Sequence, residues 1–569
     1  MDGLVLVRRA DLLQGRKLFE ECLRISPDFA SGHAALSDAD AKLGYERDAR
    51  EQARQAFQLS RTLINEKSRL SIEAQFRMAN AEAARAAEIY AQLLASHPDD
   101  IEVGLQLAGA QRKANQIPEA LKTIQELRSL PKPQSDDPRI DIVAAYTVAD
   151  QADYRQSAAL AAEAARKASA EDSRLLYAQA ISLQGGLDWY LGDARWRNLS
   201  EEALAICEQF DEKACVAAIY RRIGNADFAA LNLESADRNF AQALSIAREI
   251  GSLAEEANVL NGMALVSQAR DDLKHSQEIE NRLVIIGNQI GNPRLEQASE
   301  ANLAGALLDA GQIEAAQQKM SAALSIARAV GDRGAIADDL VSLAEMDRIR
   351  GDLATAGKTC DEGLELSREA AMVNAEVPAL AAKTRILIAA DDLAGAQAAF
   401  QEYTRLLKTG VNVSAFADRS LPVAMALATG QTASADELAA ALVREMATQR
   451  LTFEQADAEA LLAESLLSQG KPNEARTAAE SAWARVRGSQ HRLARLEIGI
   501  TRAKVTARPD LLPELIAEAH SSHAYEIELK ARMTAAQLEG RSEDLPALRG
   551  EALSHGFKYL VRSSYRRSS

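Results

Sequence analysis

Small and apolar residues recur at steps of three and four along the chain, which is the spacing of one face of an α-helix. Ala316, Met320 and Ala323 illustrate the pattern. Other stretches repeat these sizes at the same spacing: Ala236, Phe240 and Ala243; Ala356, Cys360 and Gly363; and Ala475, Ala479 and Ala482. Small residues at fixed positions let two helices approach closely, and larger ones fill the gaps between helices. The pattern therefore predicts helices that pack in a repeated way.

Turn signals recur within this pattern at a period of 40 residues. The residues that precede the second helix of each period are Leu231, Asp271, Gly311, Gly351 and Asp391, continuing at Gly430 and Gly470 and backward at Gly192. A second series, Gly251, Gly291 and Gly331, has the same spacing. Two turns per period, with helical spacing between them, predict two helices per period.

The period is shorter near the amino end and less regular near the carboxyl end. Comparable turns fall near Gly44, Asn80, Asn115 and Ala152, and later near Arg508 and Gly540. The first pair is expected to be incomplete, because "MDGLVLVRR" is too short for a full first helix while "LLQGRKLFEECLRI" has the pattern of a second helix. Since repeat arrays need polar ends, an upstream element or a partner is expected to cover Leu4, Leu6, Leu12 and Leu13.

Residues 26–57, "SPDFASGHAALSDADAKLGYERDAREQARQAF", resemble a tetratricopeptide repeat. Leu36 lies near the middle of the first helix, Gly44 is the turn, and Ala49, Ala56 and Phe57 lie on the second helix. Residues 301–334 resemble a longer subclass of the same family, and the resemblance covers nearly the whole chain. It implies an all-α, right-handed α-solenoid of about fifteen antiparallel helix pairs. The first helices would line a concave inner face and the second helices the outer face.

A narrower resemblance covers residues 66–145, which are similar to the repeat halves of certain large bacterial signalling proteins. In those proteins a serine/threonine kinase or a winged-helix DNA-binding domain precedes the repeats. Neither domain is expected here, because the sequence has no glycine-rich phosphate loop with its lysine and no HRD or DFG motif.

The repeat lengths divide the chain into four parts. We predict shorter-period repeats at 1–150, regular 40-residue repeats at 151–412, less regular repeats at 413–555 and a basic tail at 556–569. Pro422 falls where a helix interior is expected, so that pair is expected to be kinked or shifted. The tail has basic residues and no acid, and is expected to be a frayed end rather than a segment that docks on an acidic patch or a membrane.

Charge narrows the classes of partner. The 569 residues carry 82 acidic and 66 basic side chains, a net charge of −16. An acidic surface repels phosphate backbones, so nucleic acid is not the expected partner. RNA-binding arrays of helix pairs remain an alternative for the shorter repeats, although they are usually basic; salt-sensitive RNA binding would favour them. No stretch approaches 18 apolar residues, so no membrane span is expected.

No residues are predicted to perform chemistry. The four cysteines, Cys22, Cys207, Cys215 and Cys360, form no CxxC pair, so we expect reduced thiols and a cytoplasmic location. Only His520 and His523 are at helical neighbour spacing, and no third zinc ligand accompanies them. No nucleophile motif is present, and "DDPR" at 136–139 is interpreted as a helix cap. We therefore expect no metal, no cofactor and no enzymatic activity.

Candidate binding residues are those on the exposed flank of the first helices. Asparagine and arginine there can bond a peptide backbone or its carboxylates. The candidates for a partner-binding groove are Arg221, Asn225, Asn258, Asn261, Gln268, Asn302, Asp338, Glu345, Arg348 and Arg385, with Trp189 on a similar flank. The alternative interpretation is that they are solvated surface positions, and that Trp189 fills a gap between pairs.

These observations together predict a protein-interaction scaffold that binds a peptide or partner helix, basic or apolar in character, in the concave groove. The main alternative is the sensory or regulatory part of a bacterial kinase or transcription regulator, whose effector domain lies upstream or on a separate chain.

Overall fold

The structure is a computed structural model that describes residues 2–61, 63–151, 153–191, 193–369, 372–408, 418–449 and 451–565. Within these residues the chain forms thirty-one α-helices, two short 3-10 helices and no β-strand. Neighbouring helices pack in antiparallel pairs, in which the odd-numbered helix comes first. The predicted all-α solenoid of about fifteen helix pairs is therefore confirmed.

The odd-numbered helices are α1 Asp2–Arg8, α3 Ala30–Lys42, α5 Glu66–Ala79, α7 Ile101–Lys113, α9 Pro138–Ala149, α11 Arg174–Tyr190, α13 Lys213–Ala229, α15 Leu253–Ala269, α17 Pro293–Asp309, α19 Arg333–Arg350, α21 Val373–Ala389, α23 Leu421–Ala428, α25 Thr452–Ser468, α27 Arg492–Thr506, α29 Tyr525–Leu538 and α31 Lys558–Tyr565. The even-numbered helices are α2 Leu12–Ile25, α4 Glu46–Ser60, α6 Ala83–Ser96, α8 Ile117–Arg128, α10 Tyr154–Ala170, α12 Trp196–Gln209, α14 Leu233–Glu249, α16 Leu273–Ile290, α18 Ile313–Val330, α20 Leu353–Glu369, α22 Leu393–Leu407, α24 Thr432–Thr448, α26 Pro472–Val486, α28 Leu512–Ser521 and α30 Leu545–Ser554.

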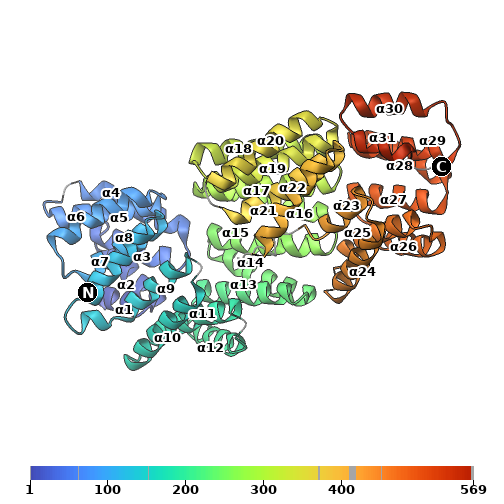
Figure 1. The fold of residues 1–569 in the computed structure, drawn as a ribbon. Helices are drawn as coiled ribbons and strands as arrows, with labels where there is room; N and C mark the ends of the chain where they lie inside the picture. Colours follow the sequence, from blue (N-terminus) through green and yellow to red (C-terminus); the bar gives the residue numbers. More distant parts are fainter. Residues whose placement is uncertain are drawn as a thin grey trace. The chain divides into compact units, whose positions relative to one another are not determined.

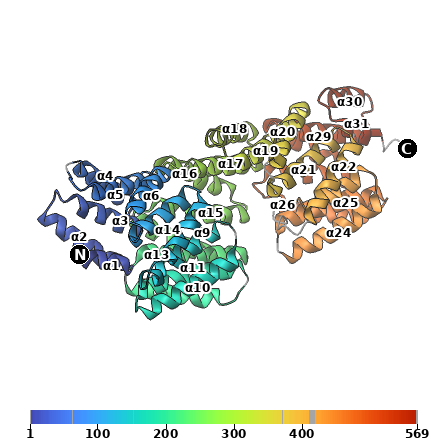
Figure 2. The ribbon, with the colours of Figure 1, turned by 60° about the vertical axis from the view of Figure 1, so that its left-hand side comes forward.

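The helices form two compact units. Unit 1 comprises residues 1–266 and 286–292, and unit 2 comprises residues 267–285 and 293–569. Within unit 2, Figures 1 and 2 show α25 beside α24 and α26, the arrangement of successive members of a stacked array. Such an array buries a continuous core that a single isolated pair would lack.

The turns between paired helices fall where the 40-residue period predicts them. Gly311, Gly351, Gly430 and Gly470 have positive φ angles. The same left-handed conformation occurs at Leu231, Asp271 and Asp391, although a Cβ disfavours it. The next residue closes each turn, as when Gln312 donates its backbone N–H to the Leu307 carbonyl at 2.8 Å. The predicted turn register is confirmed at these positions, whereas Ala152 and Gly192 lie outside the described residues.

Small residues permit close helix packing, as the sequence pattern predicted. Phe240 on α14 has no exposed surface and lies between glycines of the two flanking first helices. A Cβ atom on Gly224 of α13 would lie 2.8 Å from its ring, and one on Gly262 of α15 would lie 2.4 Å from it. Both distances are shorter than real carbon contacts, so only glycine leaves room for this ring.

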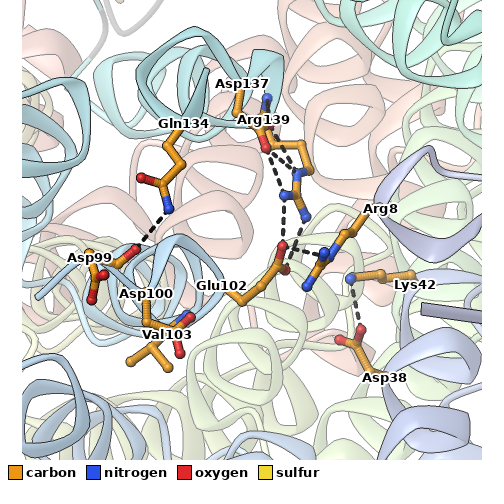
Figure 3. A network of polar contacts seen from close by, with 10 residues as sticks. All are labelled: Arg8, Asp38, Lys42, Asp99, Asp100, Glu102, Val103, Gln134, Asp137 and Arg139. Atoms are coloured by element: carbon orange, nitrogen blue, oxygen red, sulfur yellow. Dashed lines mark hydrogen bonds and ion pairs between the residues drawn. The ribbon is translucent and has the colours of Figure 1, made fainter. Parts of the chain in front are cut away.

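Unit 1 also has contacts between helices far apart in the chain. Figure 3 shows Glu102 of α7 between two arginines, Arg8 of α1 and Arg139 of α9. Glu102 lies 2.9 Å from the Arg8 Nε and 2.8 Å from an Arg139 Nη. Asp137 caps α9 by accepting the Arg139 N–H, so the helix cap predicted at residues 136–139 is confirmed. The predicted second helix at 12–25 is also confirmed, and it follows a first helix of seven residues.

The structure shows no kink at Pro422 within α23, but this first helix has only eight residues, Leu421–Ala428. Pro422 lies in the first turn of α23, where a missing backbone N–H has no intrahelical partner to lose. A proline does lie inside α21, at Pro378.

The expectation of a frayed carboxyl end is wrong for residues 558–565, which form α31. This helix contacts α21 and α29, and Phe557 and Leu560 are buried. Arg562 forms an ion pair with Asp391 at 3.0 Å, so a basic residue of this segment docks on an acid of the same unit.

The expectation of reduced thiols is wrong for two of the four cysteines. Cys207 at the end of α12 and Cys215 in the first turn of α13 form a disulfide. The tight turn brings their Cα atoms to 6.0 Å, which suits a disulfide, although the pair is too widely spaced to form a CxxC motif. Cys22 and Cys360 are free.

None of the described helices has both the length and the apolar character needed to cross a lipid bilayer.

Candidate functional site

Six first helices of unit 2 form a closed ring. The helices α19, α21, α23, α25, α27 and α29 each contact the next in this order, and α29 contacts α19. We call this arrangement the ring. Since each of its helices is the first of a pair, the ring interior corresponds to the inner face that the sequence analysis predicted to bind a partner.

Arg348 of α19 links two sides of the ring. One guanidinium nitrogen lies 2.7 Å from Glu345, one turn earlier, and another pairs with Glu526 of α29. Tyr559 donates a hydrogen bond of 2.9 Å to the second oxygen of Glu526. Burial opposes ionisation of Glu345, but the charge of Arg348 outweighs burial and lowers the pKa of Glu345. Arg348 therefore balances two carboxylates within the ring.

Two further ion pairs lie in the same interior. Arg385 of α21 lies 2.6 Å from Asp418, just before α23, and donates a hydrogen bond of 2.8 Å to Ser420. Lys530 of α29 lies 2.5 Å from Glu497 of α27. These side chains retain between 24% and 38% of their exposed surface. Solvent therefore reaches charged groups that several helices surround.

Asp457 of α25 differs from the other carboxylates of the ring. It has neither a hydrogen bond nor an ion pair within the described part of the chain, although the charges of Arg385, Asp418 and Glu497 all reach it. Burial raises the pKa of Asp457 to about 7; Arg385 opposes this shift, and Glu454, Glu497 and Asp418 add to it. Asp457 is therefore an unpartnered acid among groups that are already paired.

We expect Asp457→Asn to stabilise unit 2 most at about pH 8 and to have little effect below about pH 3.5, where the carboxyl is protonated in both the folded and the unfolded state. The pKa of Asp457 rises from its ordinary 3.8 to about 7 on folding. The folded state thus binds more protons than the unfolded state between these values, and stability falls as pH rises through this window. Thermal unfolding of both proteins across the window measures the effect. A melting difference that stays constant with pH would contradict this assignment of the titration.

Of the six predicted binding residues in unit 2, three meet in the ring and three lie apart from that cluster of charges. The ring brings together Glu345, Arg348 and Arg385, whose charges interact directly. Asp338 is exposed on α19 and has no part in this network of charges. Asn302 is exposed but bonds Glu280, and Gln268 donates to Ser276 at 3.2 Å.

The remaining predicted residues lie in unit 1. Arg221 forms an ion pair with Glu255 at 2.7 Å. Asn258 and Asn261 are exposed on α15, whereas Asn225 and Trp189 are partly buried. These five residues are spread over α11, α13 and α15.

The sequence analysis missed Asp457, Glu497, Glu526 and Lys530. One signal was available, because Asp457 stands 13 residues before the turn residue Gly470, as Asp338 stands 13 before Gly351. No residue after Arg385 was among the predicted binding residues, and the repeats become less regular beyond that point. Lys530 and Glu526 lie in the least regular part, and only the ring places them beside Glu497 and Arg348.

Other possible sites are less well formed. A cavity of about 280 Å³ lies between α2, α3 and α4, where Arg16 and Asp40 already pair at 2.6 Å. Among the described residues, no group of three or more histidines, cysteines or acids is placed to hold a metal ion.

Comparison with known proteins identifies the repeat family in one segment. Residues 77–147 match the family model described as the tetratricopeptide repeat, so the predicted resemblance is confirmed there. No curated protein sequence matches the chain.

Solved structures with a similar arrangement of helices include the apo form of RapI, at 15% identity and a TM-score of 0.49, covering 62% of this chain and 97% of that one. A signal transduction ATPase with a tetratricopeptide repeat sensor, from Pyrococcus horikoshii, is similar at 12% identity and a TM-score of 0.43, covering 63% of this chain and 52% of that one. A Rap protein complexed with Competence and Sporulation Factor is similar at 14% identity and a TM-score of 0.38, covering 74% of this chain and 99% of that one.

Proposed function

We propose that this protein is a non-enzymatic interaction scaffold that binds a peptide segment or helix of a partner along the inner flank of its first helices. The observation that carries the proposal is the convergence of charged side chains from α19, α21, α25, α27 and α29 on one solvent-accessible interior. Side chains at helical spacing on successive helices suit recognition of an extended segment or of another helix. The tetratricopeptide match at residues 77–147 agrees with a role in protein interaction.

The partner in this proposal is a protein or peptide of basic or apolar character, in the cytoplasm, and neither nucleic acid nor a membrane. The net charge of −16 favours basic groups and disfavours phosphate backbones. A second candidate is a sensory or regulatory role in a bacterial signalling protein, with a kinase or DNA-binding domain upstream or on another chain. The resemblance of residues 66–145 to such repeat regions supports it.

The experiment is a selection of binders from a random-peptide library on the purified full chain, followed by affinity measurements. We expect Asn258→Ala with Asn261→Ala to weaken the binding of peptides that lie along α15 in unit 1, by about 0.5–1.5 kcal/mol for each hydrogen bond lost. Both side chains are exposed, so the melting temperature should not change. Asn302 is left intact because it bonds the buried Glu280.

The matched control is Asn281→Ala, which removes an exposed asparagine from the second helix α16. It should leave peptide affinity unchanged. The proposed function fails if no peptide is enriched, or if neither the double asparagine variant nor any ring variant alters the affinity of the enriched peptides.

A further inference from the structure

The charged groups of the ring interior are unequal in number. Three cations face it, Arg348, Arg385 and Lys530, and all three are paired. Five carboxylates face it: Glu345, Asp418, Asp457, Glu497 and Glu526. The neighbouring Glu464 and Lys504 lie 3.9 Å apart and add no net charge. The interior therefore has two carboxylates more than it has cations.

The excess of two has two sources: one cation is shared by two carboxylates, and one carboxylate has no cation among the described residues. Arg348 forms ion pairs with both Glu345 and Glu526. The other two cations each form one ion pair, Arg385 with Asp418 and Lys530 with Glu497. Asp457 is the carboxylate left without a bonding partner in the described part of the chain. A carboxylate in a crowded site of like charge is stabilised most by a cation that approaches it and donates hydrogen bonds.

We propose that the ring interior receives a lysine or arginine side chain of a bound partner segment, with Asp457 as its acceptor. This inference rests on the proposed function and adds the chemistry that the site selects. An incoming cation supplies the charge that the interior lacks, whereas an acidic side chain there would face five carboxylates. Asp457 thereby selects segments with a basic residue at one fixed position.

The proposal also sets the pH dependence of binding. The charged groups that act on Asp457 are Arg385 of α21, Asp418 before α23, Glu497 of α27 and Glu454 of its own helix. Because its pKa lies at about 7 without a ligand, the acceptor is largely protonated at about pH 6 and largely ionised at about pH 8. A basic segment should therefore bind about tenfold more tightly at the higher pH.

The test is a double-mutant cycle on peptides enriched from the random library. Each peptide is made with arginine and with citrulline, which keeps the shape of arginine but carries no charge. In wild type the citrulline peptide should bind about 10- to 100-fold more weakly. In Asp457→Asn the two peptides should bind almost equally, and the pH dependence should flatten. Asp457→Glu, which keeps a carboxylate, should retain discrimination.

Glu454→Gln is the matched control, because it removes one negative charge from an exposed position on the same helix. It should change the affinity of the arginine peptide by less than about twofold. An equal effect of Glu454→Gln and Asp457→Asn would show that overall charge, and not an acceptor, governs binding, and would overturn the proposal.

The outcomes separate this proposal from the proposed function. If peptides bind and respond to the asparagine variants, but citrulline costs the same in wild type and in Asp457→Asn, only the further inference fails. Spermidine serves as a free-cation probe. Asp457-dependent binding of spermidine, without Asp457-dependent binding of any peptide, would overturn the assignment to a partner's side chain.

Discussion

Replacing Phe240 with alanine is expected to destabilise unit 1 by about 3–5 kcal/mol, the cost of removing a fully buried aromatic ring. The phenyl group of Phe240 fills the space between Gly224 and Gly262, and neither glycine has a side chain that can move into the cavity. Thermal unfolding should show a lower melting temperature. Amide hydrogen exchange should rise around α13, α14 and α15, because each pair of a repeat array is coupled mainly to its neighbours.

The converse substitution tests the same contact. Gly262→Ala places a Cβ 2.4 Å from the Phe240 ring, so overpacking should cost about 1–3 kcal/mol. The double variant Phe240→Ala with Gly262→Ala should be less destabilised than the sum of the destabilisations of the two single variants. The new methyl group enters the space that the phenyl group of Phe240 leaves. Gly305→Ala on α17 is the control, since nothing lies within 4 Å of its Cβ position, and it should stabilise by up to about 1 kcal/mol. If the destabilisations by Phe240→Ala and Gly262→Ala were additive in the double variant, this would argue against the packing of Phe240 on Gly262.

Replacing Arg348 with methionine is expected to destabilise unit 2 by about 3 kcal/mol. The change leaves Glu526, whose side chain is 7% exposed, without its cation, and also removes the partner of Glu345. Uncompensated carboxylates in a crowded interior cost far more than the lost attraction alone. Hydrogen exchange should rise in α19 and α29, the two helices that Arg348 joins, and it should not change in α3 and α4 of unit 1.

The control for Arg348 is the same substitution at an exposed pair. Arg328 lies 3.2 Å from Glu362, and both side chains are more than half exposed. Arg328→Met should therefore change stability by less than about 1 kcal/mol. If the two variants melted alike, the ring contact would be no more important than a surface ion pair.

The sequence by itself determined the class of fold and the positions of most turns. A 40-residue period is visible because each pair must place small residues such as Ala316 and Ala323 at the same contacts. Leu231 and Asp271 adopt the left-handed turn without being glycine, so the register and not the residue type identified them. These features are local or repeat between neighbours, and such interactions leave a periodic pattern in the sequence.

Only the tertiary structure decided which charged residues meet. Arg348 and Glu526 are 178 positions apart, and no period in the sequence relates them. They meet because the first helices curve until α29 returns to α19, and this curvature is the sum of small rotations between successive pairs. For the same reason the sequence marked Glu345, Arg348 and Arg385 as inner-face residues but passed over Asp457, whose significance depends on partners brought from α21 and α27.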